Sequence, residues 1–129
     1  MGDDPLAVVE AWQEAAGRGD VDEVLRLSSP KIEIVGPRGT ARGHDPLRAW
    51  MGHARVGLTT LRRFARGGVA VVSQHGVWRD VATGEVTGEA DVASRFRIEG
   101  GRVAEYARFD TLDETLAAAR LSYHDEVTE

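Results

Sequence analysis

The spacing of apolar residues changes part-way along this chain, and that change limits the folds it can adopt. In most of the first 54 residues, apolar side chains recur every three or four positions, which is typical of helices with one buried face. Beyond residue 58 they alternate with polar side chains, which is typical of strands. Helices followed by a run of long strands predict an α+β fold. We expect a strongly curved antiparallel sheet that wraps around the N-terminal helices and encloses a cone-shaped cavity.

Capping signals mark the expected helices. Asp4-Pro5 combines an N-cap with a proline at the first helical position, and Gly17 and Gly19 end this first helix. Its inward stripe consists of Leu6, Val9, Trp12, Gln13 and Ala16. Three further helices begin after similar signals, at Asp20, Asp45-Pro46 and Thr111. Three helices are therefore expected before the long strands and one after them.

Glycine-containing turns separate the expected strands. A short strand through Ile32 and Ile34 ends at Pro37, and an extended piece lies between Gly39 and Gly43. Four longer strands are expected over residues 58–66, 69–80, 86–99 and 102–110. The short turns between them are consistent with antiparallel hairpins. The last eight residues are polar, and we expect them to be frayed.

Composition excludes several classes of function. The 129 residues suit one domain and include no cysteine, so disulfides, thiolate catalysis and zinc–thiolate sites are excluded. The formal charge of −5 argues against nucleic-acid or membrane partners, and the basic run of Arg55, Arg62, Arg63 and Arg66 is interpreted as a solvated edge. No apolar stretch approaches the ~20 residues of a membrane helix, and no signal peptide opens the chain. We therefore expect a cytoplasmic protein.

Three polar residues near the end of the last long strand are candidates for chemistry. Tyr106, Arg108 and Asp110 lie two positions apart, so their side chains share one face. Asp110 has two interpretations: it caps the following helix or pairs with Arg108, or it transfers protons inside a cavity. Alternation does not decide which face is inward, because the opposite face, with Ala107 and Phe109, is more apolar.

The strand before the Ala82-Thr83-Gly84 turn carries a second set of candidates. Gln74 and Trp78 share one face, which we expect to line the cavity with Trp78 as a flat apolar wall. His75 lies on the other face and is interpreted as a surface or interface residue, with acid–base catalysis as the alternative.

The three tryptophans, Trp12, Trp50 and Trp78, are expected on inward faces, either in the core or around an aromatic pocket. No metal site is expected, because no second histidine or acid lies at ligand spacing.

Three motifs carry a resemblance to a known family. They are Gly19-Asp20-Val21-Asp22, then Ile34-Val35-Gly36-Pro37 with Ala41-Arg42-Gly43, and Phe96-Arg97-Ile98-Glu99-Gly100-Gly101-Arg102-Val103 leading to Phe109-Asp110. With them the chain resembles, over residues 5–121, the SnoaL-like branch of the nuclear transport factor two-like superfamily. That superfamily includes ketosteroid isomerases, limonene-epoxide hydrolases and polyketide cyclases. The resemblance implies a single domain with a cystatin-like α+β roll, and it indicates the fold better than the chemistry.

The resemblance argues against ketosteroid isomerase chemistry. That reaction requires a carboxylate base, together with a tyrosine and a protonated aspartic acid that stabilise the dienolate oxygen. The corresponding positions hold Trp12, Gly36 and Ser94. None of these residues supplies the required group, so classical isomerase activity is not expected.

Two other activities of the superfamily are matched in part. Its epoxide hydrolases use two carboxylates and an arginine, and Arg108 and Asp110 resemble part of that set. The second acid would come from the neighbouring strand, where Asp91 lies on the face opposite to Ser94 unless a bulge intervenes. Some polyketide cyclases of this branch use a single aspartate near the end of a strand, which keeps Asp110 as an acid–base candidate.

These observations favour a pocket protein for a small apolar molecule with one or two oxygens, and without a cofactor. An isomerase, cyclase or hydrolase would use Asp110 for proton transfer and Arg108 to hold its charge. Tyr106 or Gln74 would orient the substrate oxygen. The expected ligand-binding residues are Trp12, Trp50, Gln74, Trp78 and Ser94. A non-catalytic ligand-binding or dimerisation module is the alternative.

We also expect a homodimer. The long strands carry apolar residues on both faces, and a single core uses only one of them. Val77, Ala93, Ala107 and Phe109 would then pack against a second copy of the chain.

Overall fold

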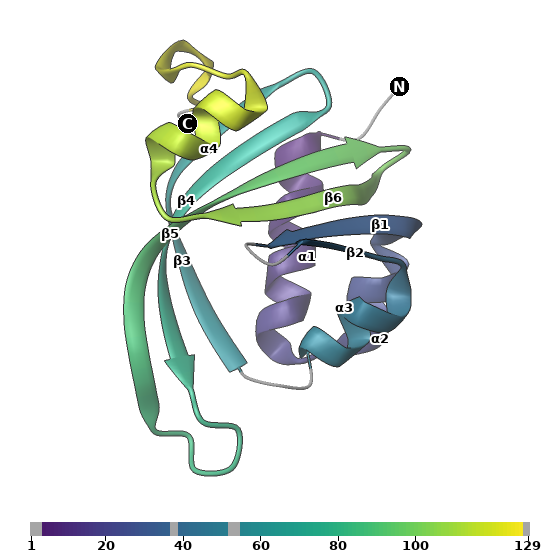
Figure 1. Ribbon diagram of the computed structural model, residues 1–129, viewed down its shortest axis with the longest axis vertical. Coiled ribbons are helices and arrows are strands. Elements are labelled where there is room, and N and C mark those ends of the chain that lie inside the picture. Colours follow the sequence, from purple (N-terminus) through teal and green to yellow (C-terminus); the bar gives the residue numbers. More distant parts are fainter. Residues whose placement is uncertain (1–3, 37–38, 52–54, 128–129) are drawn as a thin grey trace.

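A bent six-stranded sheet forms the framework of the protein (Figure 1). The computed structural model describes residues 4–36, 39–51 and 55–127. The strands are β1 (Ser28–Gly36), β2 (Gly39–Arg42), β3 (Arg55–Arg66), β4 (Val69–Arg79), β5 (Val86–Glu99) and β6 (Arg102–Phe109). The helices are α1 (Pro5–Arg18), α2 (Val21–Arg26), α3 (His44–Met51) and α4 (Leu112–Ala119), followed by a 3-10 turn at Tyr123–Asp125. The predicted α+β fold and its order of elements are confirmed.

The strands lie in the order β2-β1-β6-β5-β4-β3. Neighbouring strands are antiparallel, as predicted, except that β1 and β6 are parallel, with Ile34 opposite Tyr106. About half of the chain lies between β1 and β6, so no tight hairpin imposes an antiparallel direction on this pair. Register shifts place an extra residue in β3, between Thr60 and Arg62, and in β6, between Val103 and Glu105. Such bulges bend strands and increase their twist, which accounts for part of the curvature.

The helix boundaries follow the capping signals in the sequence. Asp4 caps α1 by accepting a hydrogen bond from the Leu6 N–H (3.1 Å), and Gly19 ends this helix with a φ of 72°, which favours glycine. Asp20 and Thr111 cap α2 and α4, each by accepting a hydrogen bond of 3.2 Å from the N–H three residues later. Within the described ranges, no helix combines the length and the apolar composition that a bilayer span requires.

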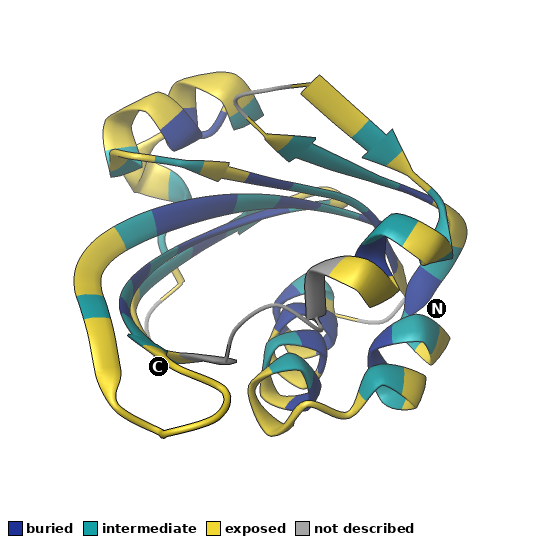
Figure 2. Ribbon diagram, turned by 60° about the horizontal axis from the view of Figure 1, so that its bottom comes forward, coloured by how far each residue is buried: buried dark blue, intermediate teal, exposed yellow. Residues whose placement is uncertain are grey.

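Helices α1 to α3 pack into the concave side of the sheet, and Figure 2 shows the buried residues gathered where the helices and the sheet meet. The core on this side includes Val9, Trp12, Ile32, Leu47, Val72 and Phe96. Trp12 and Val72 are each 1% exposed, which confirms their predicted burial. Ile34 is half-buried and packs against this core. The side chain of Trp50 lies outside the described part of the structure.

Helix α4 packs on the convex side of the sheet. Its Leu116, with the following Leu121, forms a second apolar cluster with Phe64 of β3 and Val71 of β4. Phe64 and Val71 are fully buried, although they lie on the face opposite to the three N-terminal helices. The sheet is therefore covered on both faces within a single chain.

Residues 122–127 are held by hydrogen bonds, so the expectation of fraying is wrong for this segment. The Val127 N–H donates a hydrogen bond of 2.8 Å to the Arg63 carbonyl, which attaches the segment to the edge strand β3. Arg62 of β3 donates two hydrogen bonds, of 2.9 and 2.8 Å, to the Glu126 carboxylate. The segment is polar, but its charged side chains have a partner on β3 that local composition does not reveal.

Two residues expected at a dimer interface are already buried within one chain. Ala93 and Ala107 are each 1% exposed and lie on the face across which α4 packs. They therefore offer almost no surface to a second copy, which corrects that part of the expectation. Val77 and Phe109 are half-buried. Homodimer formation stays a prediction, and light scattering should give twice the mass of one chain.

Candidate functional site

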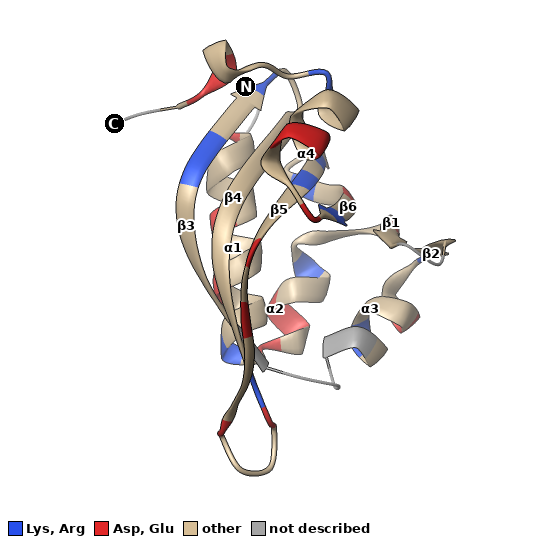
Figure 3. Cartoon of the chain, turned by 60° about the vertical axis from the view of Figure 1, so that its left-hand side comes forward, with Lys and Arg blue, Asp and Glu red and all other residues tan. Residues whose placement is uncertain are grey.

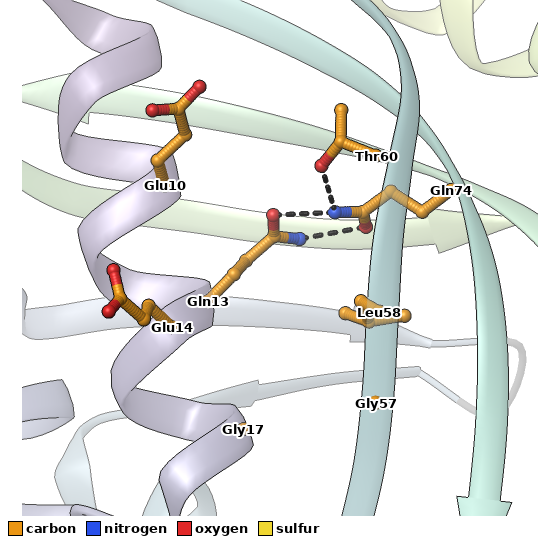
Figure 4. A pocket seen from close by; sticks show the side chains of 8 residues that line it. All are labelled: Glu10, Gln13, Glu14, Gly17, Gly57, Leu58, Thr60 and Gln74. Carbon is orange, nitrogen blue, oxygen red and sulfur yellow. Dashed lines mark hydrogen bonds between the residues drawn. The ribbon is translucent and has the colours of Figure 1, made fainter.

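A cavity of about 330 Å³ lies between α1 and the strands β3 and β4 (Figure 4). Its lining residues are Glu10, Gln13, Glu14, Gly17, Gly57, Leu58, Thr60 and Gln74. This volume is at the lower end of the range of small-molecule pockets. Glu10 pairs with Arg63 (2.9 Å) and Glu14 with Arg18 (3.5 Å), so each carboxylate in the lining has a cation beside it.

The cavity is built around a reciprocal pair of amides. Gln13 Nε2 donates to Gln74 Oε1 (2.9 Å), and Gln74 Nε2 donates to Gln13 Oε1 (2.7 Å) and to Thr60 Oγ1 (3.1 Å). Gln74 is only 1% exposed. Among the described residues, one Gln13 N–H and the Thr60 O–H have no partner, so the site offers hydrogen-bond donors to a ligand oxygen.

Strand register extends this polar site across the concave face. Gln74 pairs with Thr60 on one side and with Val92 on the other, so Ser94, two positions beyond Val92, is a diagonal neighbour of Gln74 on the same face. Ser94 in turn lies opposite Arg108 on β6, and Tyr106 precedes Arg108 by two positions on that face. We call Thr60, Gln74, Ser94, Tyr106 and Arg108 the polar band. It crosses four neighbouring strands.

Tyr106 occupies the buried end of the polar band. Its ring lies 5.3 Å from that of Trp12 and 5.1 Å from that of Phe96, which settles that Tyr106 and Arg108, and not Ala107, face the helices. Burial raises the pKa of the Tyr106 phenol, while its hydrogen bond with Ser94 and the charge of Arg108 act in the opposite direction. The phenol is therefore neutral near pH 7 and keeps its proton.

Trp78 lies beside Arg108 of the polar band and is not among the residues that line the cavity, so its part as a cavity wall stays a prediction. The guanidinium carbon of Arg108 lies 5.7 Å from the centre of the Trp78 ring, within the range of cation–π contacts. Gly76 makes room for the indole, because a Cβ at this position would lie 2.9 Å from Trp78 Cη2 and 3.4 Å from Leu58 Cδ2. The predicted inward face of β4, with Gln74 and Trp78, is therefore confirmed.

Asp110 lies elsewhere than expected. It is exposed, and it has no hydrogen bond or ion pair with Arg108, Tyr106 or any other described residue. It does not cap α4 either, because Thr111 does so. The expectation that Asp110 lies inside the cavity is wrong because β6 ends at Phe109, and alternation along the strand no longer orients the next residue. Neither Arg108 nor Tyr106 contacts the Asp110 carboxylate, so the structure does not support the predicted proton transfer by Asp110.

Trp12 is a core residue and lines no described part of the cavity. Its Nε1 donates a buried hydrogen bond of 2.9 Å to Ser28 Oγ, and Ser28 Oγ donates to the Val24 carbonyl (2.6 Å). Of the two interpretations of Trp12, the structure favours the core.

Gln13 and Thr60 are the site residues that sequence reasoning missed. The signal for Gln13 was present, since a glutamine in the inward stripe of a helix needs a buried hydrogen-bond partner.

His75 lies on the convex face, where it bridges two carboxylates. Its Nδ1 lies 2.8 Å from Asp91 Oδ1 and its Nε2 lies 3.2 Å from Glu89 Oε1. These hydrogen bonds, that to Asp91 first, raise the pKa of the imidazole. Asp91 therefore faces away from the cavity and adds no second acid there. Within residues 4–36, 39–51 and 55–127, no group of three potential ligands could hold a metal ion.

The basic run on β3 has structural partners. Figure 3 shows basic residues along this strand and acidic residues on β5 and α1. Arg62 binds Glu126, Arg63 binds Glu10 and Arg66 donates to the Arg120 carbonyl (2.6 Å). These contacts are consistent with the predicted solvated edge. The side chain of Arg55 lies outside the described part of the structure.

Comparison with known proteins identifies the family. A family model of the SnoaL-like domain matches residues 9–106, which is well over half of the chain. The chain belongs to the SnoaL-like family. This match confirms the resemblance drawn from the motifs. A comparison of this SnoaL-like domain with curated proteins gives no match.

Solved structures share the fold. An NTF2-like protein of unknown function from Burkholderia pseudomallei is 21% identical with a TM-score of 0.71, covering 89% of this chain and 96% of its own. An LEH-like epoxide hydrolase from M. tuberculosis is 15% identical with a TM-score of 0.69, covering 90% and 89%. A putative polyketide cyclase from Pseudomonas putida is 20% identical with a TM-score of 0.66, covering 92% and 98%. Likeness at these identities shows the fold alone.

Proposed function

We propose that this SnoaL-like domain binds a small apolar molecule that carries one or two oxygen atoms, in the cavity between α1 and the concave face of the sheet. The observation that carries this proposal is the reciprocal amide pair of the half-buried Gln13 and the buried Gln74. A reciprocal pair of neutral amides in the wall of a cavity of about 330 Å³ is typical of sites where a few polar groups orient a mostly apolar ligand.

The arrangement of donors indicates how the ligand oxygen is bound. The Gln13 N–H and the Thr60 O–H flank the amide pair, and both can donate to a carbonyl, ether or hydroxyl oxygen. Leu58 supplies apolar surface in the cavity lining, and the Trp78 indole lies near Leu58, next to Gly76. A ligand whose shape broke the hydrogen bonds of Gln74 would bind more weakly, because a buried polar group would lose its partner. These amides therefore select for the shape of the ligand and for the position of its oxygen.

Binding is supported better than acid–base turnover. Proton transfer requires a titratable group that reaches the substrate, and Asp110 is exposed beyond the end of β6. Solved structures described as a polyketide cyclase and an epoxide hydrolase share the fold, but their low identity carries no reaction to this chain. A non-catalytic ligand-binding module therefore accounts for the site without requiring a titratable group that reaches the ligand.

Titration of the protein with neutral cyclic ketones and alcohols, with 2-acetylnaphthalene as the reference probe, tests the proposal. Tryptophan fluorescence and calorimetry should show saturable binding. Gln74→Leu should weaken this binding about five- to tenfold, because Gln13 and Thr60 lose the partner that positions their donors for the ligand oxygen. Ser73→Ala is the control, because Ser73 precedes Gln74 on β4 and faces the other way. No saturable binding across the panel, or equal binding by the two variants, would contradict the proposal.

A further inference from the structure

Arg108 is a cation without a counterion in the described part of the structure. Most of the arginines described with their side chains lie within 4 Å of a carboxylate, namely Arg18, Arg26, Arg42, Arg48, Arg62, Arg63, Arg95 and Arg97. Arg108 has no such partner among residues 4–36, 39–51 and 55–127, and its contact is with the Trp78 ring. Asp110, two positions along the chain, does not pair with it either. Its five N–H donors are therefore open to a ligand.

The groups around Arg108 form a site that suits an anionic oxygen. Ser94 lies directly opposite Arg108 in the sheet, and the Tyr106 phenol is hydrogen-bonded with Ser94. A guanidinium that contacts an indole face can still present the N–H groups in its own plane, and that fork matches the two oxygens of a carboxylate. Trp78, beneath the guanidinium, is placed to contact the apolar part of the same ligand.

Arg108 is exposed and lies at the β6 end of the polar band, outside the lining of the cavity. The charged groups that line the cavity do not oppose this arrangement. Glu10 and Glu14 line the part of the cavity next to α1, and each is paired, with Arg63 and with Arg18. At the β6 end of the polar band, Arg108 is the residue that carries a charge. This local positive charge favours an anion.

We propose that the ligand is an organic anion, whose carboxylate is bound by Arg108 with the hydroxyls of Ser94 and Tyr106 while its ring system packs against Trp78. This inference rests on the proposed function and narrows the class of ligand. It assigns Arg108 to ligand recognition, whereas the sequence suggested a supporting part beside Asp110.

Two probes of nearly the same shape test the proposal, 2-naphthoate and neutral 2-acetylnaphthalene. Calorimetry at low salt should show 2-naphthoate binding about tenfold tighter or more, because a charge-assisted pair replaces a neutral contact. Arg108→Gln should remove this preference, because it weakens the binding of 2-naphthoate far more than that of 2-acetylnaphthalene. Arg102→Gln is the matched control, since it makes the same charge change at the start of β6, about 20 Å away along the strand.

A second variant separates charge from geometry. Arg108→Lys keeps the positive charge and loses the planar fork, so it should keep only part of the preference for 2-naphthoate. Equal affinity of the wild-type protein for both probes would overturn the inference and leave the proposed function standing. Failure of both probes to bind would overturn both. A similar loss in Arg102→Gln and Arg108→Gln would show a general effect of net charge and would also overturn it.

Discussion

Gln13 and Gln74 exchange two hydrogen bonds through their side-chain amides, although 61 positions separate them in the sequence. The pair connects α1 to the central part of β4 across the concave side of the sheet. Because both groups are neutral, they can be buried without the desolvation penalty of an ion pair. The distance between helix and sheet at the cavity is therefore set by hydrogen bonds as well as by apolar packing.

Removing one member of the amide pair should destabilise the protein more than its exposure suggests. Gln13→Leu removes both hydrogen bonds between the two amides and leaves the buried Gln74 Oε1 without its partner. We expect a loss of about 1–3 kcal/mol in the free energy of unfolding, measured by urea denaturation. The double variant Gln13→Leu/Gln74→Leu should lose less than the sum of the single changes. Glu14→Gln, on an exposed neighbouring side chain, is the control and should change stability by less than about 0.5 kcal/mol. If the loss in the double variant equalled the sum of the losses in the single variants, Gln13 and Gln74 would not be coupled.

Gly76→Ala should displace Trp78. The new Cβ would lie 2.9 Å from the indole, which is closer than two carbon atoms approach without strain. We expect a loss of about 1–3 kcal/mol in unfolding free energy and a changed tryptophan emission spectrum. Gly88→Ala on the paired strand is the control, because a Cβ there meets nothing within 4 Å. Equal stability and equal spectra of the two variants would disprove the close contact.

Stability should depend on pH through His75. Hydrogen bonds to Asp91 and then to Glu89 raise the pKa of its imidazole above the ordinary 6.5. The imidazolium therefore contributes its full stabilisation below about pH 6.5, and this contribution is lost as the pH rises through the raised pKa. Denaturation of the wild-type protein and His75→Gln should show a larger difference at about pH 6 than at about pH 9.

His124→Gln is the control for this pH dependence, because His124 has no carboxylate within ion-pair distance among the described residues. The titration of His75 can also be followed directly by NMR. A titration midpoint at or below 6.5 would show that the two carboxylates do not hold the imidazolium.

The C-terminal segment should detach when its ion pair is removed. Glu126→Gln takes away the charge to which Arg62 donates two hydrogen bonds, so the Val127 N–H should exchange with solvent faster than in the wild-type protein. Glu99→Gln, in an exposed pair with Arg97 remote from this segment, should leave that exchange rate unchanged. Unaltered protection of Val127 in Glu126→Gln would mean that backbone pairing with β3 holds the segment by itself.

Features that depend on neighbours in the sequence were predictable. The caps at Asp4, Asp20 and Thr111 and the order of helices and strands follow from local hydrogen bonding and apolar spacing. The shared face of Gln74 and Trp78 follows from the two-residue repeat of a strand. Because these interactions span only a few residues, the pattern of side chains is sufficient to predict them.

Part of the candidate site came from the resemblance, and part could not be predicted. Ser94 was identified because it stands where a related family has an aspartic acid, while Gln13 was visible only as a polar residue in an apolar stripe. The sequence around Thr60 does not mark it as a site residue, because its role depends on lying opposite Gln74 in the pairing of β3 with β4. Pairing between strands depends on register, and bulges change register without a clear trace in composition.

The sequence by itself determined the α+β class, the helix ends and the alternation within each strand, because these arise from contacts over a few residues. Only the tertiary structure decided that β1 runs parallel to β6, that Gln13 meets Gln74, that Arg108 contacts Trp78 and that Asp110 lies outside the cavity. Each of these depends on where the curved sheet brings distant residues together, and on where a strand ends. Such relationships are set by packing of the whole chain, which local periodicity does not encode.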